Sequence, residues 1–139
     1  MNDSPLIKVE TPPNFRAIVT AFPHAARPGV LFAYGEHIYN PSGVHIPRVL
    51  MVHEVKHLAR QFQASDAWWD RYIADPEFRY SEELIAHAAE LRAGLRATKD
   101  RNARYRLLRT TAWRLIADLY NYDPPRLYKQ AMADLSANV

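Results

Sequence analysis

One short motif constrains the fold of this chain more than any other, an H-E-x-x-H sequence at residues 53–57. In an α-helix four residues advance by about 400° and about 6 Å, so His53 and His57 would leave one helix face a turn apart. Two imidazoles at that separation can bind one zinc ion. Glu54 lies about 100° around the helix from His53, where its carboxylate can reach a metal-bound water. The motif therefore predicts a helix that carries part of a metal site.

Composition limits what can complete this site. The 139 residues include no cysteine, so any further protein ligand has to be His, Asp or Glu, and no disulfide can form. A content of 48% hydrophobic and 24% charged residues is typical of a globular domain. We find neither a signal-peptide pattern nor an apolar run of membrane-spanning length, so we expect a soluble cytoplasmic protein without membrane contact.

Local patterns predict an α+β fold in which the β part comes first. Three prolines within residues 1–14 predict a flexible arm, and we expect a single domain over residues 15–139. An imperfect alternation of apolar residues predicts a strand at residues 15–22. Two shorter strands are expected at residues 30–34 and 37–39, each bounded by turn residues.

Helices are expected to follow the strands. Pro47 fits the first turn of the helix that carries the H-E-x-x-H motif. A partly helical connection rich in aromatic residues is expected over residues 64–79, and Ser81 is a candidate N-cap for the next helix. The last three helices are expected over residues 81–93, 101–122 and 126–135.

A catalytic zinc ion usually has three protein ligands and one position for water, so the two histidines need a third partner. The helix after Ser81 offers Glu83 and His87, which lie one turn apart. We take Glu83 as the ligand. His87 either supports the site from the second shell of contacts or binds the metal itself. The alternative for His53 and His57 is a pair of buried, hydrogen-bonded core histidines.

The two segments together resemble a known enzyme family. HEVKH at residues 53–57 and ELIAH at residues 83–87 resemble the gluzincin metallopeptidases, whose second helix carries the third ligand in E-x-x-A-D or a similar sequence. The order of elements over about residues 15–95 is similar to the minigluzincin form of that zincin-like fold. The resemblance implies one Zn²⁺ ion with these protein ligands: His53, His57 and Glu83. It also implies that Glu54 is the general base and acid.

The same resemblance implies that peptide bonds of a peptide or protein are hydrolysed. Zinc lowers the pKa of its bound water from about 15.7 toward 7, and Glu54 would accept the proton as the water attacks. We expect the substrate to add as an extra strand beside residues 30–39. The C-terminal helix could cover the cleft and keep the enzyme latent. Four side chains are candidate donors to the oxyanion: Tyr39, Tyr72, Arg79 and Tyr80.

Two other functions stay open. The same residues could hold a structural metal in a non-catalytic interaction module. Alternatively, residues 92–114 contain eight basic residues against the single acid Asp100, and such a segment can bind nucleic acid or another acidic partner. These alternatives differ from the peptidase hypothesis in whether Glu54 matters and in where the partner binds.

Overall fold

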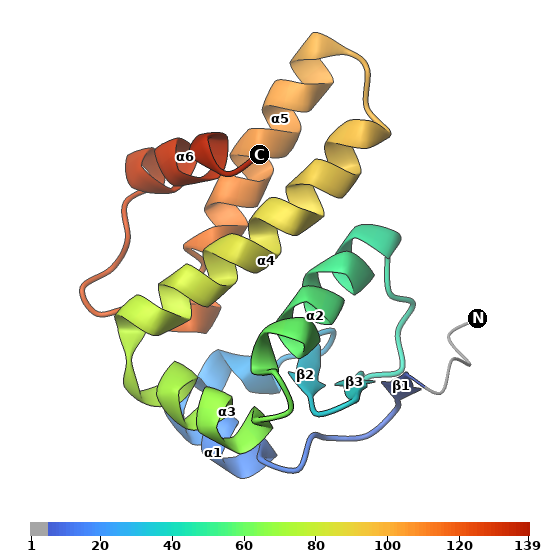
Figure 1. Cartoon of the computed structure of the whole chain (residues 1–139), viewed down its shortest axis with the longest axis vertical. Helices are drawn as coiled ribbons and strands as arrows, with labels where there is room; N and C mark the ends of the chain where they lie inside the picture. Colours follow the sequence, from blue (N-terminus) through green and yellow to red (C-terminus); the bar gives the residue numbers. More distant parts are fainter. Residues whose placement is uncertain (1–5) are drawn as a thin grey trace.

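The part of the chain that the structure describes, residues 6–139 of a computed structural model, is a mostly helical α+β fold (Figure 1). Within these residues there are six α-helices and one three-stranded sheet. The expectation of an α+β fold with a small, early β part is confirmed at this level. Across residues 6–139, no helix combines the length and the apolar character needed to cross a membrane.

The sheet joins strands from the first forty residues. Strand β1 (Ile7–Lys8) pairs in parallel with β3 (His37–Tyr39), and β3 pairs antiparallel with β2 (Phe32–Tyr34). The two strands expected after the first turn are therefore confirmed. The arm expected over residues 1–14 contributes β1 to this sheet, while its residues 1–5 lie outside the described residues.

The strand expected first along the chain is a helix instead. The chain forms α1 (Phe15–Ala21), followed by the 3₁₀ helix η1 (Pro23–Ala26). Ile18 and Phe22, four residues apart, are both buried in the core. The strand prediction over residues 15–22 is wrong because the buried apolar side chains recur at helical spacing and not at every second residue.

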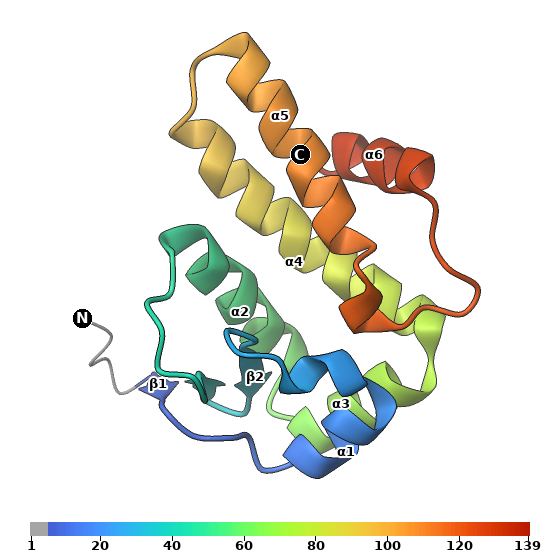
Figure 2. The same ribbon diagram turned by 180° about the vertical axis from the view of Figure 1, so that it is seen from behind.

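The helix with the H-E-x-x-H motif is α2 (Arg48–Gln61), and it begins directly after Pro47, as expected. It packs along the longest helix, α4 (Pro76–Arg96), and the two views of the ribbon show them side by side (Figures 1 and 2). Between them in sequence, α3 (Ser65–Ala74) occupies most of the stretch expected to be partly helical. The metal motif therefore lies in a helix–helix contact.

The start of α4 differs from the sequence-based expectation. Its N-cap is Asp75, whose carboxylate accepts hydrogen bonds from the backbone N–H groups of Glu77 and Phe78. Pro76 occupies the first helical position, where a missing N–H is tolerated. Ser81, the expected N-cap, lies inside the helix. The Asp-Pro pair is thus the start signal of the helix and not an interruption of the connection before it.

The C-terminal third is also helical, with different boundaries. α5 (Arg101–Leu115) ends earlier than expected and is followed by the 3₁₀ helix η2 (Asp118–Tyr120) and by α6 (Tyr128–Ala137). α4 continues through Gly94, beyond its expected end. A Cβ atom at Gly94 would lie 2.8 Å from Cδ2 of Leu107, so the glycine permits a close approach of α4 and α5.

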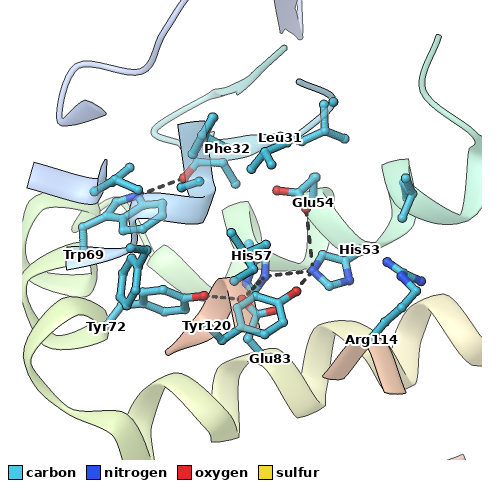
Figure 3. A pocket seen from close by; sticks show the side chains of 18 of the residues that line it. Leu31, Phe32, His53, Glu54, His57, Trp69, Tyr72, Glu83, Arg114 and Tyr120 are labelled. Atoms are coloured by element: carbon cyan, nitrogen blue, oxygen red, sulfur yellow. Dashed lines mark hydrogen bonds and ion pairs between the residues drawn. The ribbon is translucent and has the colours of Figure 1, made fainter. Parts of the chain in front are cut away.

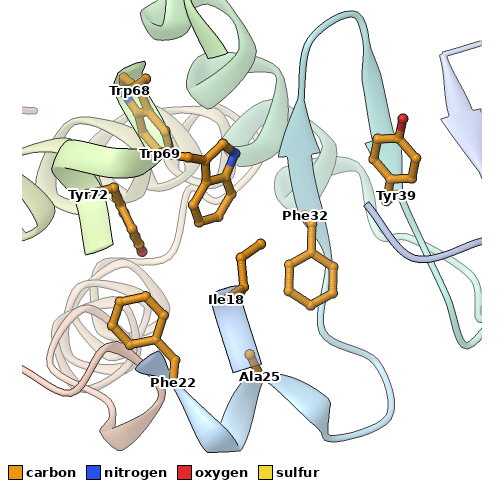
Figure 4. Packing of buried hydrophobic residues seen from close by; sticks show 8 residues of the cluster. All are labelled: Ile18, Phe22, Ala25, Phe32, Tyr39, Trp68, Trp69 and Tyr72. Carbon is orange, nitrogen blue, oxygen red and sulfur yellow. The ribbon is translucent and has the colours of Figure 1, made fainter. Parts of the chain in front are cut away.

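Two apolar clusters form the core of the described residues. The first, drawn in Figure 4, joins α1, η1, the sheet and α3 through Ile18, Phe22, Ala25, Phe32, Tyr39, Trp68, Trp69 and Tyr72. The second joins α4 to α5 and α6 through Tyr80, Ala88, Leu91, Ala112, Leu115, Tyr122, Ala131 and Leu135. Because α4 contacts both α2 and the C-terminal helices, it connects the metal motif to the second cluster.

The two candidate N-caps of α4 predict different changes in the free energy of unfolding. Replacing Asp75 by Ala removes the acceptor for two N–H groups and should lower the free energy of unfolding by about 0.5–2 kcal/mol. Replacing the exposed Ser81 by Ala should change it by less than about 0.5 kcal/mol. Urea unfolding of the two variants measures both values. A larger loss for Ser81→Ala than for Asp75→Ala would contradict the cap assignment.

Candidate metal centre

The buried face of α2 is unusually polar. Its buried residues are His53, Glu54, His57 and Gln61, and they recur at helical spacing along one side of the helix. The facing side of α4 buries Glu82, Glu83, His87 and Glu90 among small apolar residues. Ionisable side chains are rarely buried unless they are paired or bind a metal. The contact between α2 and α4 is therefore a candidate functional site.

Three of the predicted ligands converge at this contact (Figure 3). Nε2 of His53 lies 3.1 Å from Nε2 of His57 and 3.3 Å from Oε1 of Glu83, and Nε2 of His57 lies 3.1 Å from Oε2 of Glu83. Donor atoms about 2.0–2.1 Å from a tetrahedral zinc ion lie about 3.3–3.4 Å from one another. These three residues could therefore hold a metal ion with little movement.

The donor set also fits a cation chemically. The Nε2 atoms of His53 and His57 and the two carboxylate oxygens of Glu83 point toward one another, so their lone pairs share a small volume. Within residues 6–139, Oε1 of Glu83 has no hydrogen-bond partner. Tyr72 donates its hydroxyl hydrogen to Oε2 of Glu83 at 2.6 Å, which fixes the carboxylate toward the histidines. A cation would satisfy the converging donors better than protons could.

Glu54 lies beside the three candidate ligands, as expected from the motif. Its Oε2 is 3.6 Å from Nε2 of His53, and its side chain lines the adjoining cavity. Burial raises the pKa of the Glu54 carboxyl, although positive charge on His53 and His57 opposes this effect. A carboxylate with a raised pKa accepts a proton more readily, which suits a general base.

A carboxylate that the sequence analysis missed orients His53. Oε1 of Glu90 lies 2.9 Å from Nδ1 of His53, and Oε2 of Glu90 forms an ion pair with Arg114 of α5. When Nδ1–H donates to Glu90, Nε2 is left free to face the ligand site. The signal for Glu90 was present in the sequence, because it follows Glu83 by seven residues and so shares its helix face.

His87 is completely buried next to these groups. Its Nδ1 donates to the backbone carbonyl of Glu83 at 2.8 Å, and its Nε2 has no hydrogen-bond partner among residues 6–139. Burial, together with positive charge on His53, lowers the pKa of His87 to about 3, so the ring is neutral. His53, His87 and Glu90 form a second group that could hold a metal ion, and it shares His53 with the first.

Access to solvent separates the two possible metal positions. A cavity of about 230 Å³ is lined by His53, Glu54, His57 and Glu83, but neither His87 nor Glu90 lines it. The apolar part of its wall comes mainly from α1, η1, the segment around β2, and α3. Figure 3 shows Leu31, Phe32 and Trp69 of this wall. Only the group with His57 and Glu83 therefore faces a space that a second molecule could enter.

The oxyanion donors considered from the sequence lie elsewhere or are already engaged. Tyr39, Arg79 and Tyr80 do not line the cavity, and the hydroxyl of Tyr72 is bound to Glu83. The side chain that lines the cavity instead is Tyr120 of η2. Burial raises the pKa of Tyr120 well above its usual value, so its hydroxyl keeps its proton. Sequence spacing gave no signal for Tyr120, because η2 approaches the site only in the folded chain.

The C-terminal helix does not cover the site. α6 packs against α4 and α5, and the lining of the cavity includes no residue after Tyr120. The latency hypothesis, in which the segment beyond Asp123 lies across the cleft, is therefore wrong for this structure.

No protein-family model matches the chain, and no match was found among curated proteins or solved structures. The gluzincin resemblance consequently rests on residues 53–57 and 83–87 and on the site described above. The zinc-dependent peptide hydrolysis that this resemblance implies is therefore a proposal.

The hydrogen bond from His53 to Glu90 predicts the effect of removing that carboxylate. Glu90→Gln should lower zinc affinity about 10- to 100-fold, because Nδ1 of His53 loses its charged acceptor. Glu36→Gln, at an exposed turn residue, is the matched control and should leave affinity unchanged. Competition with a chromophoric chelator measures both. Equal affinity of the two variants would contradict the role given to Glu90.

Metal affinity should also depend on pH. Burial opposes a charge on His53, but the carboxylates of Glu83 and Glu90 beside its ring raise its pKa to about 10 in the metal-free protein. A metal ion at Nε2 displaces this proton, so binding competes with protonation at every pH below about 10. We expect affinity to rise by up to about tenfold per pH unit between pH 6 and 8. The chelator competition, repeated across this range, tests it, and a flat profile would contradict it.

Proposed function

We propose that this chain is a small zincin-like, zinc-dependent metalloendopeptidase of the gluzincin type. The observation that carries the proposal is the convergence of His53, His57 and Glu83 at spacings suited to tetrahedral zinc, with Glu54 beside them and a cavity in front. Two imidazoles and one carboxylate are a ligand set found in catalytic zinc sites. The absence of cysteine is consistent with such a set.

The residues around the ligands suit hydrolysis of an amide. A zinc ion bound here would supply a Lewis acid and a water of lowered pKa. Glu54 would accept one proton from the water as its oxygen attacks the carbonyl carbon, and would deliver that proton to the amine nitrogen as the C–N bond breaks. Tyr120, protonated at neutral pH, would donate a hydrogen bond to the developing oxyanion.

We place the substrate at a position that differs from the one expected from sequence. β2 lies at one edge of the sheet, but the carbonyl of Ala33 already accepts hydrogen bonds from Gln61 at 2.7 Å and from Trp69 at 3.0 Å. A peptide therefore cannot bind along the whole edge. Residues 29–31, which lead into β2 and line the cavity, are the segment where we place an extended substrate.

The direct test compares wild type with Glu54→Gln. Wild type should contain about one zinc ion per chain and cleave an unfolded protein such as reduced casein. Glu54→Gln should keep the zinc and lose at least about 100-fold in kcat/KM, because the proton acceptor is removed. Metal analysis and a fluorogenic proteolysis assay measure these values, with Glu36→Gln as the control.

The outcomes separate the alternatives. Near-zero zinc in protein purified without chelator would contradict the proposal and the structural-metal alternative together. Stoichiometric zinc with equal, negligible activity in wild type and Glu54→Gln would instead favour a non-catalytic metal-containing interaction module.

A further inference from the structure

One exposed helix surface remains unexplained by the metal centre. α5 buries Thr111, Ala112 and Leu115 against its neighbours and contains no acidic residue along its whole length. Together with the end of α4 it forms a hairpin whose tip projects beyond α2 and the sheet (Figures 1 and 2). We use the name α5 face for five exposed residues of this helix, which run from its N-terminal end to the side away from α4: Arg101, Tyr105, Arg106, Arg109 and Trp113.

The basic residues of this hairpin divide into those with internal partners and those without. Arg114 is paired with Glu90, and Arg104 donates to the backbone carbonyls of Leu95 and Thr98 at 2.6 Å and 2.8 Å. Asp100, which lies between α4 and α5 in the sequence, accepts from the N–H group of Ala103 as the N-cap of α5. These two arginines are therefore structural.

The cations of the α5 face have no such partner. Within residues 6–139, none of Arg101, Arg106 and Arg109 forms an ion pair with an acidic side chain. The same holds for Arg96 and Lys99 at the adjoining end of α4. A cluster of exposed cations without counter-charges attracts a polyanion.

Two aromatic rings lie among these cations. Tyr105 and Trp113 are each 56% exposed, although large aromatic residues are usually mostly buried. The guanidinium of Arg109 lies 5.9 Å from the ring centroid of Tyr105. Trp113 stacks on Tyr128 of α6 with ring centroids 4.3 Å apart, which holds its indole in place. Exposed rings beside arginines are the arrangement that stacks nucleobases while the arginines contact phosphates.

We propose that the α5 face binds single-stranded nucleic acid, with Arg101, Arg106 and Arg109 at phosphates and with Tyr105 and Trp113 against unpaired bases. An acidic protein would use the cations but would give the exposed rings no stacking partner. A duplex would do the same, since its bases are already stacked and paired. The α5 face is separate from the cavity in front of the metal ligands, so this inference does not depend on the proposed peptidase activity.

The test measures fluorescence anisotropy of a fluorescein-labelled 20-nucleotide oligo(dT) and of a 20-base-pair duplex over 25–300 mM salt. Wild type should prefer the single strand, with log K falling linearly against log salt concentration. Substituting Arg101, Arg106 and Arg109 together by Gln should reduce that slope by about 2, because each lost phosphate contact removes about 0.7. Tyr105→Leu should weaken binding about 5- to 150-fold and leave the slope unchanged.

Three controls make the result specific. Arg16→Gln alters an exposed arginine of α1, away from the hairpin, and should bind as wild type does. Glu54→Gln should also bind normally, whatever its peptidase activity. Circular dichroism melting of each variant identifies any that fail to fold, and Arg106→Gln alone then replaces the triple variant, with a slope reduction of about 0.7.

Several results would overturn the inference. These are absent or salt-independent binding of oligo(dT), equal binding by wild type and the arginine variants, or duplex binding as tight as single-strand binding with no effect of Tyr105→Leu. Displacement of oligo(dT) by poly-glutamate at equal charge concentration would also overturn it, and would point to an acidic protein partner.

Discussion

The structure depends on the packing of α2 against α4, because these helices bury charged faces against each other. Burying a charge costs several kcal/mol unless it is paired and hydrogen-bonded. Here the partners are supplied reciprocally, with Glu83 facing His53 and His57, and with Glu90 bound to the far nitrogen of His53. These pairings favour the observed register of the helix pair, since a shift of either helix would leave a buried charge unpaired.

Neighbouring elements are connected to this contact through the same carboxylates. Glu82 accepts from the indole N–H of Trp68 at 2.9 Å and from Arg60, which connects α3 to the helix pair. Glu90 connects α5 through Arg114, and Tyr72 of α3 donates to Glu83. Alongside the apolar clusters, these polar contacts attach α3 and α5 to the helix pair at the site. On α5, Arg114 therefore has a structural role, whereas Arg101, Arg106 and Arg109 form no ion pair with an acidic side chain of residues 6–139.

The sequence predicted which side chains come together where their spacing along a helix is local. His53, His57 and Glu83 were predictable because each helix places residues four apart on one face, and the structure brings the three together. It failed where the tertiary structure decides. A strand was predicted over residues 15–22, where the chain forms α1, because the apolar residues were assigned a period of two. The cavity-lining Tyr120 comes from the 3₁₀ helix η2, which has no regular apolar spacing. Glu90 lies between these cases, since its spacing was visible but its partner, His53, is 37 residues away.

The charges at the site bear on the choice between a metal centre and a pair of core histidines. Structural histidines in a core usually satisfy both ring nitrogens. Within residues 6–139, Nε2 of the fully buried His87 has no hydrogen-bond partner, and three carboxylates surround His53. A proton on His53 supplies one positive charge among them, which is why its pKa rises to about 10 despite burial. A divalent cation would supply two charges and accept the converging lone pairs as well, so the arrangement favours a cation site over a hydrogen-bonded core.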